Sequence, residues 1–221
     1  METMPGFNMI SIEWFGQSMF RIVGGGVTVV VDPTDPRTGY EYSPVNADAV
    51  LVSHEHYDNI YLDGVSGKTE IVRKPGEHEV AGLRVQAFQT YHDEAGGKER
   101  GPNLIFAWEQ ENFRIAHFGD LGERLSPSVC DQLGDIDILM IPVGGVFTID
   151  GEQATCQIDV LEPKIVLPMH YKTEDGVVAV KPLADFLEHY PGPVVEVAER
   201  PVLVKHSQLP KATECWVLPY K

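Results

Sequence analysis

Short apolar runs separated by turn residues mark the first half of the chain. Apolar residues that alternate with polar ones, or follow one another without interruption, are typical of half-buried and fully buried β-strands. The pair at positions 16–17 and the three glycines at 24–26 separate the first of these runs and are compatible with turns. The pattern predicts strands over residues 10–15, 19–23, 27–32, 49–52, 70–73, 83–90, 103–108 and 113–116.

Strands alternate with helices in the second half. Ser126 followed by Pro127 is a typical helix start, because a serine side chain can cap the helix and proline suits its first position. We predict helices over residues 126–133, 152–161 and 181–189, and strands over residues 136–142 and 165–169. A strand-rich half followed by an alternating half favours an α/β or α+β fold with a large sheet core.

Length and composition are those of one globular unit. A chain of 221 residues with 43% hydrophobic content can bury a sizeable core. It contains no internal repeat and no linker, so we expect a single domain over residues 1–221. No apolar run approaches the ~20 residues that a membrane-spanning helix needs.

The cysteines and the N-terminus indicate a reducing compartment. Cys130, Cys156 and Cys215 are widely scattered and odd in number, which fits reduced thiols better than a disulfide framework. We expect these thiols to act as small buried apolar groups. Residues 1–8 lack the basic region and apolar core of a secretory signal. The sequence therefore predicts a cytoplasmic protein.

The charge balance restricts the class of partner. Acidic residues outnumber basic ones by 33 to 17, and the formal net charge is −16. Proteins that bind nucleic acid need positive surface to hold phosphates, and an anionic membrane surface would be repelled in the same way. The negative net charge counts against nucleic acid and membranes as partners and favours a small-molecule substrate. A homo-oligomer remains possible.

Residues 54–59, which read H-E-H-Y-D-N, carry the clearest chemical signal. They follow the apolar run 49–52 and Ser53, so we expect a buried strand to deliver them at its carboxyl end. Two histidines two residues apart leave a strand end on the same side, where both imidazoles can meet one ion. Neutral imidazole is a common zinc ligand, and the nearby aspartate can hold a second ion or the attacking water. We therefore predict a metal site at this loop.

With this loop the chain resembles the metallo-β-lactamase superfamily, whose signature is H-x-H-x-D-H. Four further positions of the superfamily occur in the expected order, each after an apolar strand: Asp32, His92, Asp120 and His170. The resemblance extends over about residues 9–205, and five motifs in register are hard to assemble by chance.

The resemblance implies an α/β fold, the four-layer αββα sandwich, with metal bound along one edge of the two sheets. It implies one or two divalent ions, zinc above all, with manganese or iron as alternatives. The ligands that it implies are His54, His56 and His92 for the first ion, and Asp58, His170 and the shared Asp120 for the second. Asp32 would serve the site indirectly, by hydrogen-bonding a ligand histidine or the loop backbone.

The same resemblance implies a metal-dependent hydrolase. A metal-bound hydroxide, oriented by Asp58, would attack a small-molecule ester, lactone or phosphoester, because metal coordination lowers the pKa of water towards ~7. The chain is most similar to the branch that contains a sugar-phosphate lactonase and many hydrolases of unknown substrate. A true β-lactamase is not expected, since those enzymes act outside the cytoplasm.

Two positions depart from the superfamily pattern. Asn59 stands where a histidine usually completes the signature, and Gln17 stands where relatives often carry a histidine. An amide oxygen is a weaker donor than imidazole, so we expect one tight and one looser metal site. Two alternatives stay open: Asn59 caps a helix over residues 60–65, or the chain is a metal-binding protein of the same fold with reduced or lost catalysis.

Basic side chains near the predicted ligands are candidates for binding an anionic substrate. Lys98 and Arg100 lie in a glycine-containing loop after His92, and Lys172 lies two residues after the last ligand. A merely solvated, charged loop would explain Lys98 and Arg100 equally well. His117 is a weak ligand candidate, because its neighbours predict a strand position.

Overall fold

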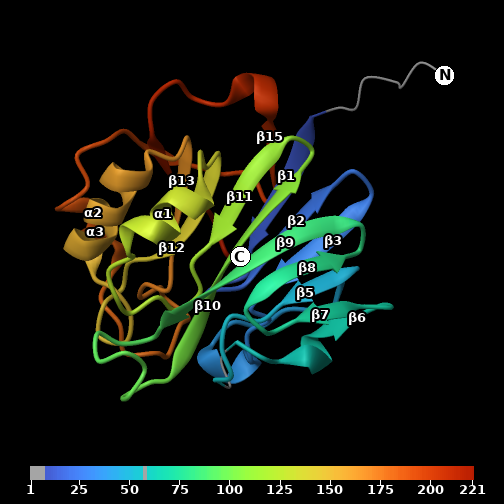
Figure 1. Cartoon of the computed structure of the whole chain (residues 1–221), viewed down its shortest axis with the longest axis horizontal. Coiled ribbons are helices and arrows are strands. Elements are labelled where there is room, and N and C mark those ends of the chain that lie inside the picture. The colour runs from blue at the N-terminus through green and yellow to red at the C-terminus, as the bar shows by residue number, and fades with distance from the viewer. Residues whose placement is uncertain (1–7, 57–58) are drawn as a thin grey trace.

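Two large β-sheets form the centre of the protein, in a computed structural model that describes residues 8–56 and 59–221 (Figure 1). The strands of the first sheet are β1 (Met9–Trp14), β2 (Phe20–Gly24), β3 (Val27–Val31), β5 (Ala49–Leu51), β7 (Glu70–Val72) and β15 (Val202–Lys205). Their order across the sheet is β15-β1-β2-β3-β5-β7. β5 pairs in parallel with both β3 and β7, while the pairs around β1 and β2 are antiparallel.

The second sheet has eight strands and mixes two pairing modes. Its strands are β8 (Gly76–Val80), β9 (Leu83–Tyr91), β10 (Pro102–Gln110), β11 (Phe113–His117), β12 (Ile138–Pro142), β13 (Ile165–Met169), β14 (Val194–Glu196) and β16 (Glu214–Val217). The order is β14-β16-β13-β12-β11-β10-β9-β8. β9 and β11 are both antiparallel to β10, and β11, β12 and β13 run parallel to one another. The carboxyl ends of β9, β11, β12 and β13 therefore lie at the same edge of the sheet.

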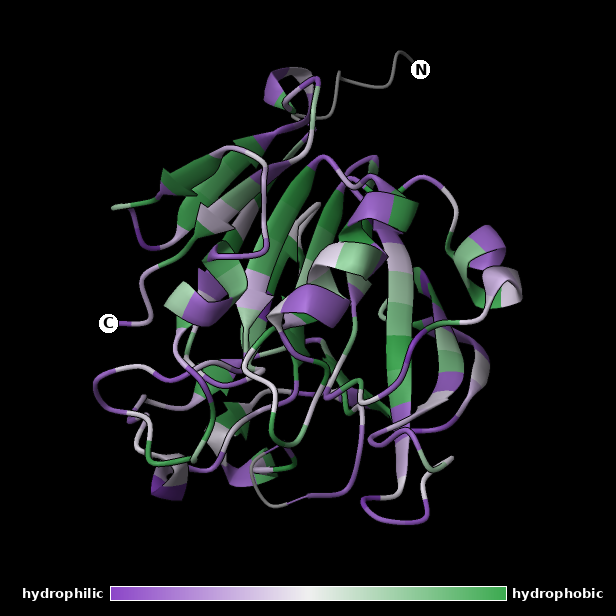
Figure 2. Ribbon diagram, turned by 90° about the vertical axis from the view of Figure 1, so that its left-hand side faces the viewer, coloured by the Kyte–Doolittle hydropathy of each residue, from purple (hydrophilic) through white to green (hydrophobic). Residues whose placement is uncertain are grey.

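Alternation along the strands divides the apolar residues between two cores. In β3, Val29 and Val31 pack into the large cluster that contains Phe106 and Trp108 of β10, while Val30 belongs to a second cluster on the other face. Successive side chains of a strand point to opposite faces, so β3 must be covered on both sides. The strands are largely hydrophobic along their length, and the loops that join them are mostly hydrophilic (Figure 2).

Three α-helices cover the outer face of the eight-stranded sheet, beside β12 and β13 (Figure 1). They are α1 (Pro127–Leu133), α2 (Gly151–Leu161) and α3 (Leu183–Leu187). The Ser126 side chain accepts a hydrogen bond from the Val129 N–H and caps α1, as its sequence predicts. Asp150 and Gln153 form a capping box at the start of α2.

The outer face of the six-stranded sheet carries a different kind of layer. Its cluster of Phe15, Met19, Val30, Val50 and Val52 is covered by irregular chain, short turns and a two-stranded sheet. These covering elements are the 3-10 turns η1 (Pro36–Thr38) and η2 (Leu62–Gly64) and the strands β4 (Val45–Asn46) and β6 (Val65–Ser66); a third 3-10 turn, η3 (His206–Gln208), follows β15. The structure confirms the predicted metallo-β-lactamase type of fold. Among the described residues, however, the layer over the six-stranded sheet contains no α-helix.

Two predicted helices differ from the structure. Residues 60–65 form only the 3-10 turn η2 followed by β6, and the N-cap of that turn is Tyr61 rather than Asn59. Six residues are too few to nucleate an isolated helix, and Val65 is already extended. The helix predicted over residues 181–189 is shorter, because Pro182 is its N-cap and the Lys181 N–H bonds to the Gly144 carbonyl instead.

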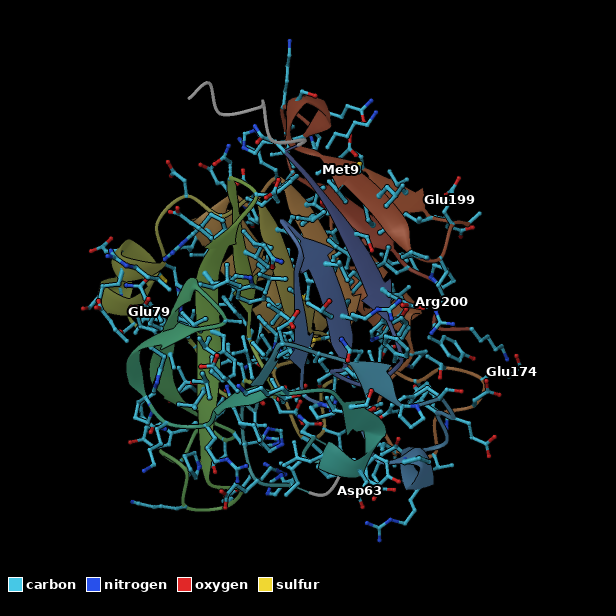
Figure 3. All side chains as sticks on the ribbon, turned by 90° about the vertical axis from the view of Figure 1, so that its right-hand side faces the viewer. Met9, Asp63, Glu79, Glu174, Glu199 and Arg200 are labelled. Atoms are coloured by element: carbon cyan, nitrogen blue, oxygen red, sulfur yellow. The ribbon has the colours of Figure 1, made fainter. Side chains whose placement is uncertain are left out.

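The surface is acidic on several separate elements. Asp63, Glu79, Glu174 and Glu199 all lie at the periphery of the protein, far from one another (Figure 3). None of the helices in the described part of the chain is long and apolar enough to cross a membrane.

The three cysteines differ in exposure, and we expect them to differ in reactivity. Cys215 is fully buried, as predicted, and burial raises the pKa of its thiol to about 12, whereas Cys156 is exposed, contrary to prediction. Thiolate is the reactive form, so a thiol reagent should modify Cys156 of the folded protein quickly and Cys215 only after unfolding. Peptide mapping after timed alkylation measures both, and equal rates at the two positions would contradict the structure.

Candidate metal centre

Four loops meet where the two sheets lie side by side, each at the carboxyl end of a strand. The loop after β5 carries His54 and His56, and β9, β11 and β13 lead into His92, Asp120 and His170. The first sheet thus contributes two histidines, and the second contributes the other three side chains. The site exists only where the two sheets pack together.

Five of the six predicted ligands come together in the structure. The ligand atoms of His54, His56 and His92 all lie within 4.8 Å of one another. Asp120 Oδ2 lies 3.0 Å from Nε2 of His170, 3.3 Å from Nε2 of His92 and 3.6 Å from Nε2 of His54. The Asp120 carboxylate therefore joins the three-histidine group to His170. The sixth predicted ligand, Asp58, lies outside the described residues.

The buried nitrogen of His54 shows that a metal ion suits this group. Its Nε2 atom has no hydrogen-bond partner among the described residues, although the side chain is almost fully buried. A buried polar atom without a partner costs free energy, and a cation would supply the partner. Three imidazole nitrogens and one carboxylate oxygen form a donor set typical of zinc. The residues present therefore fit the divalent ion that the sequence predicts.

Hydrogen bonds from outside the group orient the two buried histidines. Ser53 Oγ donates to Asp32 Oδ2 at 2.7 Å and lies 2.9 Å from His54 Nδ1, so the Nδ1–H of His54 can donate to it. Nδ1–H of His92 donates to the Phe147 carbonyl at 2.9 Å. In both rings the proton lies on Nδ1, so the Nε2 lone pair points at the centre. Hydrogen-bond partners fix metal-binding histidines in this way. Asp32 also accepts the Ser53 backbone N–H at 2.7 Å, so it acts one residue away from His54.

Backbone strain is concentrated around the centre. Gln17, Asp32 and His170 have φ values of 51°, 48° and 54°, in the left-handed region that non-glycine residues rarely adopt. Each such residue costs about 1–3 kcal/mol and persists only where the surroundings hold it. The His170 N–H donates to the Gln17 carbonyl at 3.1 Å, so a backbone hydrogen bond links two of the strained residues. Gln17 thus contributes its backbone carbonyl to the site.

A polar network that the sequence analysis missed holds Asp120. Ser18 Oγ donates to Asp120 Oδ1 at 2.8 Å, and the Asp120 N–H donates to Asn103 Oδ1 at 3.0 Å. The Asn103 amide in turn donates to Thr90 Oγ1 at 2.9 Å and to the Phe118 carbonyl at 3.0 Å. Asn103 is fully buried near the start of β10, and its one signal in the sequence is an amide directly before the apolar run 104–108.

His117 is part of the scaffold and not of the metal group. Its Nε2–H donates to the Ser18 carbonyl at 2.9 Å, and its Nδ1 accepts the Gly119 N–H at 3.0 Å. Both ring nitrogens are therefore used by the backbone. Complete burial lowers the pKa of His117 to about 4, so the ring is neutral, as this bonding requires.

The charge states of the centre favour cation binding. Burial lowers the pKa of His54 to about 3, against the opposite influence of Asp120. Burial alone would raise the pKa of Asp120, but its electrostatic interactions with His170 and His54 and the hydrogen bonds from His170 and His92 hold it well below its usual range. A neutral imidazole and an ionised carboxylate are the forms that bind a metal.

The Asn59 side chain lies inside the centre. It is fully buried, with Nδ2 3.3 Å from His54 Nδ1 and 3.5 Å from Asp120 Oδ1. Its Oδ1 atom has no hydrogen-bond partner among the described residues. Together with the N-cap at Tyr61, this position shows that the helix-capping alternative is wrong.

The loop after His92 is held by its first residue. Asp93 Oδ1 accepts the N–H groups of Ala95 and Gly97, and Oδ2 accepts those of Glu99 and Arg100, at distances between 2.7 and 3.1 Å. Burial alone would raise the pKa of Asp93, but these four donors lower it. The loop is therefore a compact, internally bonded unit beside the metal ligand.

A cavity of about 430 Å³ opens between this loop and the turn that precedes α2. His92, Arg100, Phe147, Val146 and Gln153 are among the residues that line it. Val146 has a φ of 65°, which is a marked outlier for a β-branched residue, and its side chain is 56% exposed. Of the proposed metal ligands in the described part of the chain, His92 is the one that lines this cavity.

The three basic side chains predicted to bind substrate lie in different environments. Arg100 lines the cavity beside His92, whereas Lys98 is exposed and is not among the lining residues. The Lys172 ammonium donates to the Gly176 carbonyl of its own loop. Of the three, Arg100 is the one that the fold places next to the centre.

Comparisons with known proteins agree with this geometry. The model of the β-lactamase superfamily domain matches residues 11–170, a span that includes every predicted ligand. A UPF0173 protein of Pyrococcus abyssi is 30% identical over 190 residues, which are 76% of this chain and 86% of that protein. A UPF0173 metal-dependent hydrolase of Thermococcus onnurineus is 27% identical over 77% of this chain and 88% of its own length. A solved structure from Thermotoga maritima, described as a candidate zinc-dependent hydrolase of the metallo-β-lactamase superfamily, is 32% identical, with a TM-score of 0.78 over 95% of this chain and 98% of that one.

Proposed function

The chain belongs to the metallo-β-lactamase superfamily, and from this premise we propose that it hydrolyses a small-molecule ester, lactone or phosphoester with a divalent metal ion. The observation that carries the proposal is the buried Nε2 atom of His54, which has no hydrogen-bond partner among the described residues and lies in a group of four histidines and Asp120. The acidic surface supports a small substrate rather than a polyanion.

The residues divide the work of such a reaction. When bound, the ion supplies an activated water and a Lewis acid for the carbonyl or phosphoryl oxygen. His54, His56, His92, Asp120 and His170 would hold one or two ions, and Asp58, which lies outside the described residues, is proposed to orient the water. The water oxygen bonds to the acyl carbon or phosphorus and the bond to the leaving oxygen breaks. The proton passes by way of the carboxylate to the leaving group.

A substrate panel on defined metal forms tests the proposal. The zinc, manganese and iron forms should be tested side by side on lactones, acyl esters and phosphoesters. We expect turnover that Asp58→Ala removes while the variant keeps a cooperative melt. Metal bound at full stoichiometry without turnover of any class would instead support a metal-binding protein with lost catalysis.

The amide of Asn59 predicts unequal affinities for two ions. A second ion would rely on Asp58, Asp120 and His170, an oxygen-rich set that binds zinc less tightly than imidazoles do. We expect one tight and one weaker zinc site in the wild type, and a tighter second site in Asn59→His. Titration calorimetry on metal-free protein measures both steps. Two equally tight zinc sites in the wild type would contradict the prediction.

A further inference from the structure

A single arginine faces the cavity beside the metal centre. The Arg100 guanidinium carbon lies 5.7 Å from the centre of the Phe147 ring, and both side chains line the same cavity as His92. The Arg100 backbone is fixed by the bond from its N–H to Asp93 Oδ2 at 2.7 Å. The guanidinium is thus placed by a held loop on one side and an aromatic ring on the other, while its donors stay accessible.

The acidic residues of the cavity are already engaged. Asp93 accepts four backbone N–H groups, and Glu94 Oε1 accepts the Gln153 side-chain amide at 2.7 Å. Glu99 lies 3.6 Å from the Arg100 guanidinium, but its side chain is 65% exposed. An exposed ion pair of this kind contributes little, so an incoming anion can displace it. Arg100 is the group of this cavity whose charge is open to a ligand.

We propose that the Arg100 guanidinium, stacked on Phe147, binds a carboxylate of the substrate at a distance from the bond that is hydrolysed. A planar guanidinium matches a carboxylate by two parallel hydrogen bonds, and the ring below it limits its freedom to turn. A singly charged group suits the site better than a phosphate dianion, because three carboxylates line the same cavity. The exposed faces of Phe147 and Val146 would contact the aliphatic part that joins this carboxylate to the reacting group. This inference rests on the proposed function, because it assigns the reacting end of the substrate to the metal.

Matched pairs of acids test the subsite without turnover. Calorimetry on the zinc-loaded full chain should compare succinate with butyrate, glutarate with pentanoate, and adipate with hexanoate. In each pair one carboxylate can reach the metal, and the second is present in the diacid alone. We expect at least one diacid to bind about tenfold tighter than its partner, and Arg100→Gln to remove that difference. The control is Arg84→Gln, since Arg84 is exposed on β9, the strand that leads into His92, but about 26 Å from His92 along the extended chain.

The outcomes separate this inference from the proposed function. Equal binding within all three pairs, or a diacid preference that survives Arg100→Gln, overturns the subsite. Loss of the preference in Arg84→Gln overturns it as well, since general charge would then be the cause. Hydrolysis of adipate mono(4-nitrophenyl) ester and of 4-nitrophenyl hexanoate tests the reaction itself. No turnover of either ester or of the wider panel, with the Arg100-dependent preference intact, would reject the hydrolase and leave a carboxylate-binding site.

Discussion

Replacing His54 and His56 together by alanine is expected to abolish zinc binding. The two rings supply two of the three nitrogen donors that lie within 4.8 Å of one another, and their centres are 4.8 Å apart. Loss of one partner that merely orients a ligand already costs 10–100-fold in affinity, so loss of two ligands should exceed about 100-fold. Elemental analysis of the purified variant after zinc loading and desalting measures the effect.

A second double variant controls for the loss of histidine in general. His78 and His189 lie outside the metal group, and their replacement by alanine should leave the zinc content unchanged. Both double variants should melt cooperatively, because none of the four histidines contributes much to apolar packing. Full zinc content in the His54→Ala, His56→Ala variant would show that the ion binds elsewhere.

Replacing Asn103 by alanine is expected to damage both the stability of the fold and the metal centre. The change leaves the Asp120 N–H and the Phe118 carbonyl without this buried partner, while Thr90 Oγ1 keeps its bond to the backbone carbonyl of residue 103. Each lost partner costs about 1–3 kcal/mol, so we expect roughly 3 kcal/mol in the free energy of unfolding. For a chain of this size this corresponds to roughly 10 °C in melting temperature. Zinc affinity should fall as well, since Asp120 loses a bond that orients it.

Melting the metal-free and zinc-loaded forms separates these two effects. A drop that is already present without metal belongs to the polar network, and any additional drop in the zinc form belongs to weaker metal binding. Asn46→Ala removes the same side chain from an exposed position on β4 and should change the melting temperature little. A wild-type melt for Asn103→Ala in both forms would show that the network is not needed.

The strands could be predicted where their pattern is local. The apolar runs that became β1, β2, β3, β5, β9 and β13 are bounded by turn residues; burial alternates along β1 and β2, while β5 and β13 are buried throughout. β8, with the polar sequence GEHEV, has no such pattern and is ordered by antiparallel pairing with β9. β14 and β16 pair in parallel over 20 residues of separation, and no local signal encodes this contact.

The metal ligands could be predicted from the sequence, whereas the residues that support them could not. A histidine or aspartate directly after an apolar strand is visible in the sequence, and the parallel arrangement brings such strand ends together. Ser18, Asn103 and Phe147 act through neighbours that become adjacent only in the folded chain. Phe147 contributes its carbonyl to His92 and its ring to the cavity, and neither role depends on a sequence motif.

The division of the ligands between two sheets sets the order in which the protein can mature. His54 and His56 come from the first sheet, while His92, Asp120 and His170 come from the second. A growing or unfolded chain can offer a metal only the donors of one loop, His54, His56 and Asp58, because His92, Asp120 and His170 are brought together by long-range strand pairing. We therefore expect a metal ion to bind after the two sheets have packed together, and to be released when the sheets separate. Metal retention during partial unfolding should report on the contact between the sheets and not on the strength of either sheet alone.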